Sequence, residues 1–419
     1  MNVLKKFTLS LITIILLLTL CACSVADSQT QSDRPAVSQA PVPENSVSPE
    51  DEEEPEPEPE SAAGEILPAT IEILGKEYDE NETFLDLSDM HPEDIAEITG
   101  KMAEMPQLSE VNLMPEDGEP LLSLTAVYTL KEALPGIHFD YGFDLYEQHL
   151  TTEDTEVSFV KAEIGNEGEE SIRQALTVLD KCEYFLLDDC GIDDEIMAQI
   201  REDFPDTKVV WRVHVGWKSA LTDDQVIRMT HGINDSMTGP LKYCNEVIYM
   251  DLGHDSGITD ISFIENMPDL ECLILSDAHF TDLTPLTNCH KLVWLELVSC
   301  YYIQNLSVIA DMDSIKYLNI SYTQTRDISG IMDMNLERFS CIGNPVSRDS
   351  FDEYCEAHPD CLCVYTGNPY GYAWRYDDYG YTYFSYYARM RDVFRYTQSS
   401  PSGGFKMPEE EPAEEVEEN

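Results

Sequence analysis

The sequence predicts an α/β solenoid in which short parallel strands line a concave face and irregular or short helical segments form the convex side. Two observations predict this fold. A repeat of about 22 residues runs through 247–346, and a longer unit of helix, proline and strand occurs on both sides of it. A single unit of this kind cannot bury its own apolar face, so successive units must stack and share one elongated core.

Residues 1–22 have the pattern of a lipoprotein signal peptide. Lys5 and Lys6 precede an apolar run over 7–20 that is short for a permanent membrane-spanning helix. The run ends in Leu20-Cys21-Ala22-Cys23, which resembles the bacterial lipobox and implies that Cys23 carries the lipid. We therefore expect a lipid-anchored protein at the cell membrane, facing the extracellular side. An ordinary cleaved signal peptide or an uncleaved anchor is the alternative.

Two acidic segments flank the folded region. Residues 23–65 form a Pro/Glu-rich stalk that lacks aromatic residues, and residues 398–419 form a second acidic tail. Such segments bury too little apolar area to offset chain entropy, so we expect both to be disordered. The chain has 81 acidic and 25 basic residues, for a formal charge of −56, which argues against nucleic acid as a partner.

Residues 66–246 are expected to form an irregular, helix-bearing repeat region. Helix, proline and strand patterns occur around Pro135 and Pro205, and again around Pro359 after the short repeats. In the second of these units, acidic residues predict the start of a helix that ends near Phe204. A separate small α/β domain over 67–215 is the alternative.

Residues 247–346 contain five copies of the short repeat. Each copy has apolar residues at relative positions one, four and six, which predicts a short strand with one buried face. The copies begin at Val247, Leu270, Leu292, Ile315 and Leu336, in steps of 23, 22, 23 and 21 residues. Together with the intervening "FTDLTPLTNCHK" type of segment, this pattern resembles the bacterial leucine-rich repeat of internalin-like proteins. The resemblance implies recognition or adhesion as the general class of function.

Residues at repeat positions three, five, seven and eight should point outward on the concave face. Aromatic side chains beside acids suit a protein or glycan surface, because they offer a large contact area at little rotamer entropy. Alternatively, these aromatic residues only stack on one another across the strands. The predicted binding residues are Tyr249, Asp251, His254, Trp294, Glu296, Tyr317, Asn319 and Tyr322.

Residues 347–397 are expected to form a C-terminal cap that includes a tyrosine-rich segment. From Phe384 onward, Tyr387, Met390 and Val393 recur at helical spacing, so a short amphipathic helix could close the end of the solenoid. The tyrosines near 376–383 could instead form an exposed platform for sugars or peptides.

The cysteines favour structural roles over chemical ones. Cys190 and Cys300 occupy the repeat position that takes Asn or Cys, so we expect buried thiols that bond to backbone. Cys355, Cys361 and Cys363 lie close together, and a disulfide between two of them is permitted outside the cell. Zinc at these cysteines and calcium at the acidic stretch 188–195 are weak alternatives, because neither has the ligand spacing of a known motif. No metal or cofactor is expected.

The sequence contains no catalytic motif of a hydrolase, no phosphate-binding loop motif and no dinucleotide-binding motif. We therefore expect a non-enzymatic protein that binds a protein or glycan partner through the concave face. A structural envelope scaffold is one alternative, and a cell-wall or glycan hydrolase with a degenerate site in 66–229 is another.

Overall fold

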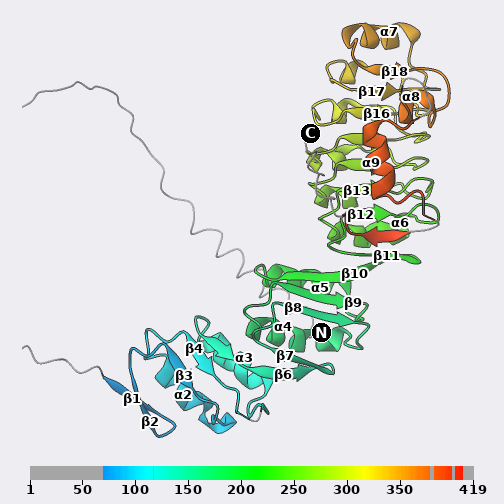
Figure 1. Cartoon of the computed structure of the whole chain (residues 1–419). Helices are drawn as coiled ribbons and strands as arrows, with labels where there is room; N and C mark the ends of the chain where they lie inside the picture. The colour runs from blue at the N-terminus through cyan, green and yellow to red at the C-terminus, as the bar shows by residue number, and fades with distance from the viewer. Residues whose placement is uncertain (1–68, 117, 378–381, 399–401, 409–419) are drawn as a thin grey trace, which may run out of the picture. The chain divides into compact units, whose positions relative to one another are not determined.

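A computed structural model describes residues 69–408 apart from 117, 378–381 and 399–401 (Figure 1). The predicted signal peptide, Cys23, the stalk and the end of the acidic tail lie outside the described residues. The described residues belong to one compact unit. No helix in the described part of the chain is long and apolar enough to cross a membrane.

The first part of the unit contains two hairpins and a small parallel sheet. The sheet has the order β3-β4-β5, and helices connect its strands in the way expected for parallel neighbours. Its elements are β1 (Thr70–Ile73), β2 (Lys76–Asp79), β3 (Phe84–Asp86), η1 (Pro92–Asp94), α2 (Ile95–Met102), β4 (Glu110–Asn112), α3 (Leu124–Ala133), β5 (His138–Asp140), β6 (Gly142–Leu145) and β7 (Gln148–Thr151).

The next part is a four-stranded sheet in the order β11-β10-β9-β8. Strands β8, β9 and β10 are parallel, and β11 returns antiparallel to β10. Helix α5 ends before Phe204, as the sequence predicts. The elements are β8 (Glu156–Val160), η2 (Asn166–Gly168), α4 (Glu169–Val178), β9 (Tyr184–Asp188), α5 (Asp194–Asp203), β10 (Lys208–Val215) and β11 (Lys218–Leu221).

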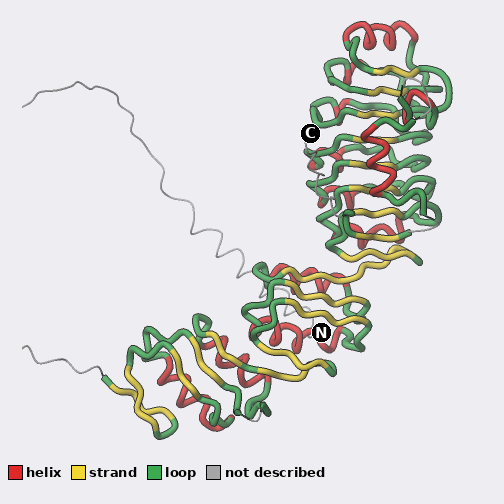
Figure 2. The backbone as a smooth tube through the Cα atoms, viewed as in Figure 1, coloured by secondary structure: helices red, strands yellow, loops and turns green. Residues whose placement is uncertain are grey.

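The short repeats supply β13 to β17 of an eight-stranded sheet, and Figure 2 shows its strands stacked one above another. Seven strands, from β12 to β18, are parallel and in register, and the eighth strand lies antiparallel beside β12. They are β12 (Val226–Arg228), β13 (Tyr249–Asp251), β14 (Cys272–Ile274), β15 (Trp294–Glu296), β16 (Tyr317–Asn319), β17 (Arg338–Ser340) and β18 (Leu362–Val364).

Short helical turns on the convex side connect these strands, as the sequence predicts. They are α6 (Asp235–Thr238), η3 (Gly239–Tyr243), η4 (Ser262–Asn266), η5 (Thr284–Asn288), η6 (Ser307–Ile309) and η7 (Ser329–Ile331). Repeat positions four and six point into the core, where Leu273, Leu275, Leu295 and Leu297 are fully buried. Burial of one such leucine contributes roughly 1.5–3 kcal/mol, so each repeat depends on its neighbours for stability.

The C-terminal part of the chain differs from the predicted cap. Helix α7 (Arg348–Ala357) and β18 complete the stack, following the predicted helix, proline and strand unit. The chain then turns back along the sheet as a segment that we call the C-terminal strap, which comprises residues 369–377, 382–398 and 402–408. It contains α8 (Tyr372–Arg375), α9 (Ser385–Val393) and β19 (Gly403–Phe405). Figure 1 shows α9 crossing the strands of the eight-stranded sheet.

Strand β19 corrects the predicted extent of the acidic tail. Residues 403–405 pair antiparallel with β12, so the ordered chain extends beyond 398. At Gly403, which has a φ of +145°, an added Cβ would lie 2.7 Å from the backbone oxygen of Ser219. A side chain does not fit this close approach, so glycine is required where the strap reaches the sheet edge.

Candidate binding site on the concave face

Six of the eight predicted concave-face residues lie on one face of the sheet, in register from strand to strand, and His254 and Tyr322 lie on the loops that follow. Tyr249 pairs with Cys272, which pairs with Trp294, which in turn pairs with Tyr317. Their exposure is not as predicted, since Tyr249, Asp251, Trp294, Glu296, Tyr317 and Asn319 are all buried. Only His254 and Tyr322 remain exposed. The expectation of an open binding surface at the six buried positions is therefore wrong.

The C-terminal strap buries these residues. The Trp294 ring packs 4.5 Å from that of Trp374 and is nearly parallel to that of Tyr386 at 5.9 Å. The Cys272 thiol meets the thioether of Met390 at 3.3 Å, and the Tyr249 ring contacts that of Phe394. The predicted helix from Phe384 therefore exists, and its apolar side covers the sheet face instead of the end of the solenoid.

Polar groups on the concave face also bind the strap. Glu296 accepts hydrogen bonds from Trp374 Nε1 and from Arg375, both at 2.8 Å. Asp251 accepts a hydrogen bond from the Tyr396 hydroxyl at 2.7 Å and another from the backbone N–H of Gly253. Burial raises the pKa of Asp251. Asn319 donates to the carbonyl of Pro369, where the strap begins.

The sequence contained a signal for this cover. In the strand Trp294–Glu296 and its neighbours, positions three and four are both apolar, so each strand carries apolar side chains on both faces. Strands buried on both faces show this composition, whereas a strand that faces water on one side alternates apolar and polar residues. The concave aromatic residues were therefore a core pattern rather than the pattern of an open surface.

A cavity of about 500 Å³ remains between the sheet and the strap. Sequence reasoning missed the three arginines that line it, because they come from segments far apart in the chain. Arg228 belongs to β12, Arg375 to α8 and Arg391 to α9. Asp251, Glu296, Ser276, Tyr370, Tyr387 and Tyr396 complete most of the wall, and His231 and His254 line it from loops that follow the strands.

Those loops share one backbone conformation. The fifth residue after the start of each strand has a left-handed φ, as at His231 (68°), His254 (68°) and Tyr322 (59°). In four of these loops its N–H donates to a carbonyl of the next repeat, as His254 does to Ser276 and Tyr322 does to Ile342, both at 2.7 Å, and this bond fixes the turn. Side chains of successive repeats therefore form a row at the carboxyl ends of the strands.

We call the exposed residues on these loops the rim, defined as His231, His254, Tyr301, Tyr302 and Tyr322. The rings of His231 and His254 lie 5.0 Å apart, and His254 Nδ1 lies 2.8 Å from a carboxylate oxygen of Asp277. Tyr301 and Tyr302 are 49% and 52% exposed. The rim thus presents polar aromatic side chains to solvent next to the strap.

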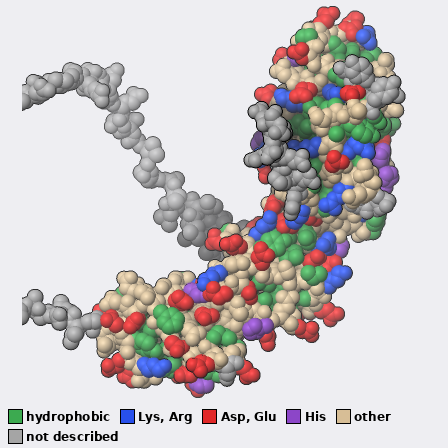
Figure 3. All heavy atoms as spheres, in the orientation of Figure 1, with side chains coloured by type: hydrophobic (Ala, Val, Ile, Leu, Met, Phe, Trp, Pro, Cys, Tyr) green, Lys and Arg blue, Asp and Glu red, His purple; other side chains and the backbone are tan. Residues whose placement is uncertain are grey.

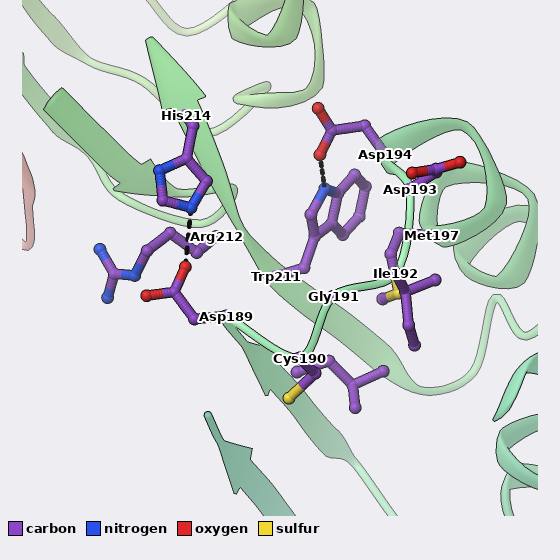
Figure 4. Close-up of a pocket in the computed structure, with 11 residues that line it drawn as sticks. Asp189, Cys190, Gly191, Ile192, Asp193, Asp194, Met197, Trp211, Arg212 and His214 are labelled. Atoms are coloured by element: carbon purple, nitrogen blue, oxygen red, sulfur yellow. Dashed lines mark hydrogen bonds and ion pairs between the residues drawn. The ribbon is translucent and has the colours of Figure 1, made fainter. Parts of the chain in front are cut away.

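A second hollow lies on the four-stranded sheet beside the acidic stretch 188–195 (Figure 4). His214 Nε2 lies 2.7 Å from Asp189 on one side, and on the other side Trp211 Nε1 donates to Asp194 at 2.9 Å. Arg212 forms an ion pair with Asp188. These carboxylates are already bound by other side chains, and no group of three or more His, Cys, Asp or Glu in the described ranges is arranged to hold a metal ion.

The cysteines are structural where the sequence predicts it. Cys300 is buried and its thiol donates to the carbonyl of Leu275 at 3.1 Å, while Cys190 bonds to that of Phe159. The predicted disulfide is not formed. Cys355, Cys361 and Cys363 are free thiols of intermediate exposure.

The repeat, the register of its strands and the convex turns define the fold as a leucine-rich-repeat solenoid. No family model matches the chain, and no curated protein matches it. Three similar solved structures come from bacteria, and the assignment of the fold does not depend on them.

An internalin from Listeria monocytogenes is 15% identical, with a TM-score of 0.28, over 64% of this chain and 59% of its own. The match therefore spans less than two thirds of that internalin. Internalin C2 from the same species is 21% identical, with a TM-score of 0.26, over 35% of this chain and 70% of its own. A leucine-rich-repeat protein of Leptospira interrogans is 13% identical, with a TM-score of 0.27, over 63% of this chain and 74% of its own.

Proposed function

We propose that this chain is a lipid-anchored, non-enzymatic recognition protein of the cell surface that binds a protein or glycan partner. The observation that carries the proposal is the rim, where exposed tyrosines and histidines from successive repeats gather along one edge of the solenoid. Such side chains contribute most where interfaces are anchored, because a large amphipathic ring loses little rotamer freedom on contact. The strap occupies the sheet face itself, so the partner contacts the rim and the outer side of the strap.

Acidity supports a solvent-facing position for the protein. Figure 3 shows acidic side chains spread over the visible face of the chain. A strongly negative surface keeps neighbouring copies apart and soluble, which suits a protein held at high local density on a membrane. The anchor itself is tested by Cys23→Ser, which should move the protein from the membrane fraction to the soluble fraction and abolish incorporation of labelled fatty acid.

The rim is tested with a pair of matched variants of the full chain, immobilised in nonionic detergent and exposed to envelope extract of the source bacterium and to host mucosal extract. The rim variant is Tyr301→Ser with Tyr302→Ser, and the control is Phe84→Ser, at a position that is 46% exposed and distant in sequence. Exposed substitutions of this kind change stability by roughly 0.5 kcal/mol or less. Circular dichroism and thermal melting verify the folding of both variants.

A partner held by the parent and the control but lost by the rim variant supports the proposal. Loss of an anchoring aromatic residue costs about 2 kcal/mol or more of binding free energy, which is roughly a 30-fold weaker affinity. Equal capture by all three proteins would overturn the assignment of the rim. Turnover of a glycan or peptide substrate by the parent would overturn the non-enzymatic role.

A further inference from the structure

We propose that the cavity between the sheet and the C-terminal strap binds a carboxylate-bearing saccharide, with the arginines Arg228 and Arg391 holding the carboxylate. The inference rests on the proposed recognition role and names the ligand class of a second site, beneath the strap. The cavity of about 500 Å³ has the size of a small-molecule site, and its wall combines charged groups with aromatic rings.

The balance of charge in the wall favours an anion. Of the three arginines, only Arg375 forms an ion pair within the described ranges, with Glu296 at 2.8 Å. Arg228 donates to the backbone carbonyls of Phe394 and Arg395, and Arg391 lies over the ring of Tyr383 at 4.3 Å. Neither has a carboxylate partner among the described residues. This is unusual in a chain with 81 acidic and 25 basic residues, where most cations can find an acid nearby.

Neither carboxylate of the wall forms an ion pair with Arg228 or Arg391 among the described residues, and the charge of Arg228 acts on Asp251 only at longer range. Glu296 is occupied by Arg375 and Trp374, and Asp251 is held by Tyr396 and by the backbone of Gly253. The buried Nε of Arg228 has no hydrogen-bond partner among the described residues. An unmade bond at a buried cationic donor is costly, so a ligand oxygen at this position would be strongly favoured. The flat guanidinium fork matches a carboxylate.

The rest of the wall suits the hydroxyl groups and faces of a sugar ring. Arg375 lies between the rings of Tyr370 and Tyr387, at 4.8 and 5.1 Å, so both rings are held in place. The Ser276 hydroxyl donates to Glu296 at 3.3 Å and the Tyr396 hydroxyl donates to Asp251, so both oxygens can still accept a hydrogen bond from a sugar hydroxyl. His231 and His254 line the same cavity and are exposed, so a ligand can enter beside the rim.

The experiment is isothermal titration of the full chain in nonionic detergent with D-glucuronate, D-glucose and acetate. Arg391→Gln removes the positive charge that α9 contributes to the cavity, and Arg228→Gln removes the positive charge that β12 contributes. The matched control is Arg389→Gln, because Arg389 lies on the same helix α9, is exposed and does not line the cavity. Melting curves and near-ultraviolet circular dichroism verify that the strap stays docked in each variant.

We expect glucuronate to bind the parent and the Arg389 variant equally, and to bind the Arg391 variant about tenfold or more weakly, the effect of one charge-assisted hydrogen bond. Glucose and acetate should each bind more weakly than glucuronate. The proposal is overturned if glucuronate does not bind at millimolar concentration, if Arg389→Gln weakens it as much as Arg391→Gln, or if acetate binds as tightly. Failure here leaves rim-dependent capture unaffected, so the two proposals fail separately.

Discussion

Removal of the Trp374 side chain should release the C-terminal strap while the repeats stay folded. Trp374 is buried against Trp294, and its Nε1 donates to Glu296. Truncation of a buried tryptophan to alanine costs about 3–5 kcal/mol. The Trp374→Phe variant keeps most of the apolar contact and loses only the hydrogen bond, at a cost of roughly 1–3 kcal/mol. The two variants therefore separate packing from hydrogen bonding.

Amide hydrogen exchange followed by mass spectrometry measures this release segment by segment. A loss of about 3 kcal/mol corresponds to exchange that is at least roughly 100-fold faster. In Trp374→Ala we expect this acceleration in α9, with much smaller changes in β14 to β16, whose cores lie on the other side of the sheet. The reasoning is refuted if exchange in α9 stays within about threefold of the parent, or if α9 and the strands accelerate equally.

Three further predictions concern single buried groups. Because burial raises the pKa of Asp251, the native chain binds the carboxyl proton more tightly than the unfolded chain does, so the stability of the parent falls as pH rises above about 4. The melting temperature of Asp251→Asn should therefore rise relative to that of the parent between about pH 3 and pH 6. A difference in melting temperature that stays constant over this range would contradict the prediction. Leu295→Ala should lower the free energy of unfolding by about 2–5 kcal/mol in urea titrations, and a loss below about 1 kcal/mol would mean that the repeat tolerates the gap. Burial also raises the pKa of Cys300, so iodoacetamide should label it only after unfolding, and rapid labelling of the native protein would show that this core opens.

The repeats could be predicted from sequence because their signal is local and periodic. Positions four and six mark the core in every copy, and residues such as Leu273 and Leu295 lie where this spacing places them. The helix, proline and strand units were readable for the same reason. Each prediction depended on contacts between residues about one repeat apart, and the same contact recurs several times.

The strap could not be predicted in this way because its contacts are long-range and occur once. Tyr387 and Met390 showed helical spacing, but spacing alone does not say which surface a helix covers. The apolar residues on the concave face of the strands indicated that something covers this face, but they did not indicate which segment does so. The cavity arginines carry no periodic signature, so only the folded structure brings Arg228 and Arg391 to one site.

The contact between the strap and β12 also favours one order of folding for this molecule. Arg228 and the backbone of Phe394 meet across 166 residues of sequence, so their contact closes a long loop. Contacts of such high sequence separation form late, because the loop entropy is lost before the contact stabilises anything. The stacked repeats must therefore exist first, for a time, with the aromatic ladder around Trp294 uncovered. During that interval the chain is most prone to aggregate, and arrival of the C-terminus ends it.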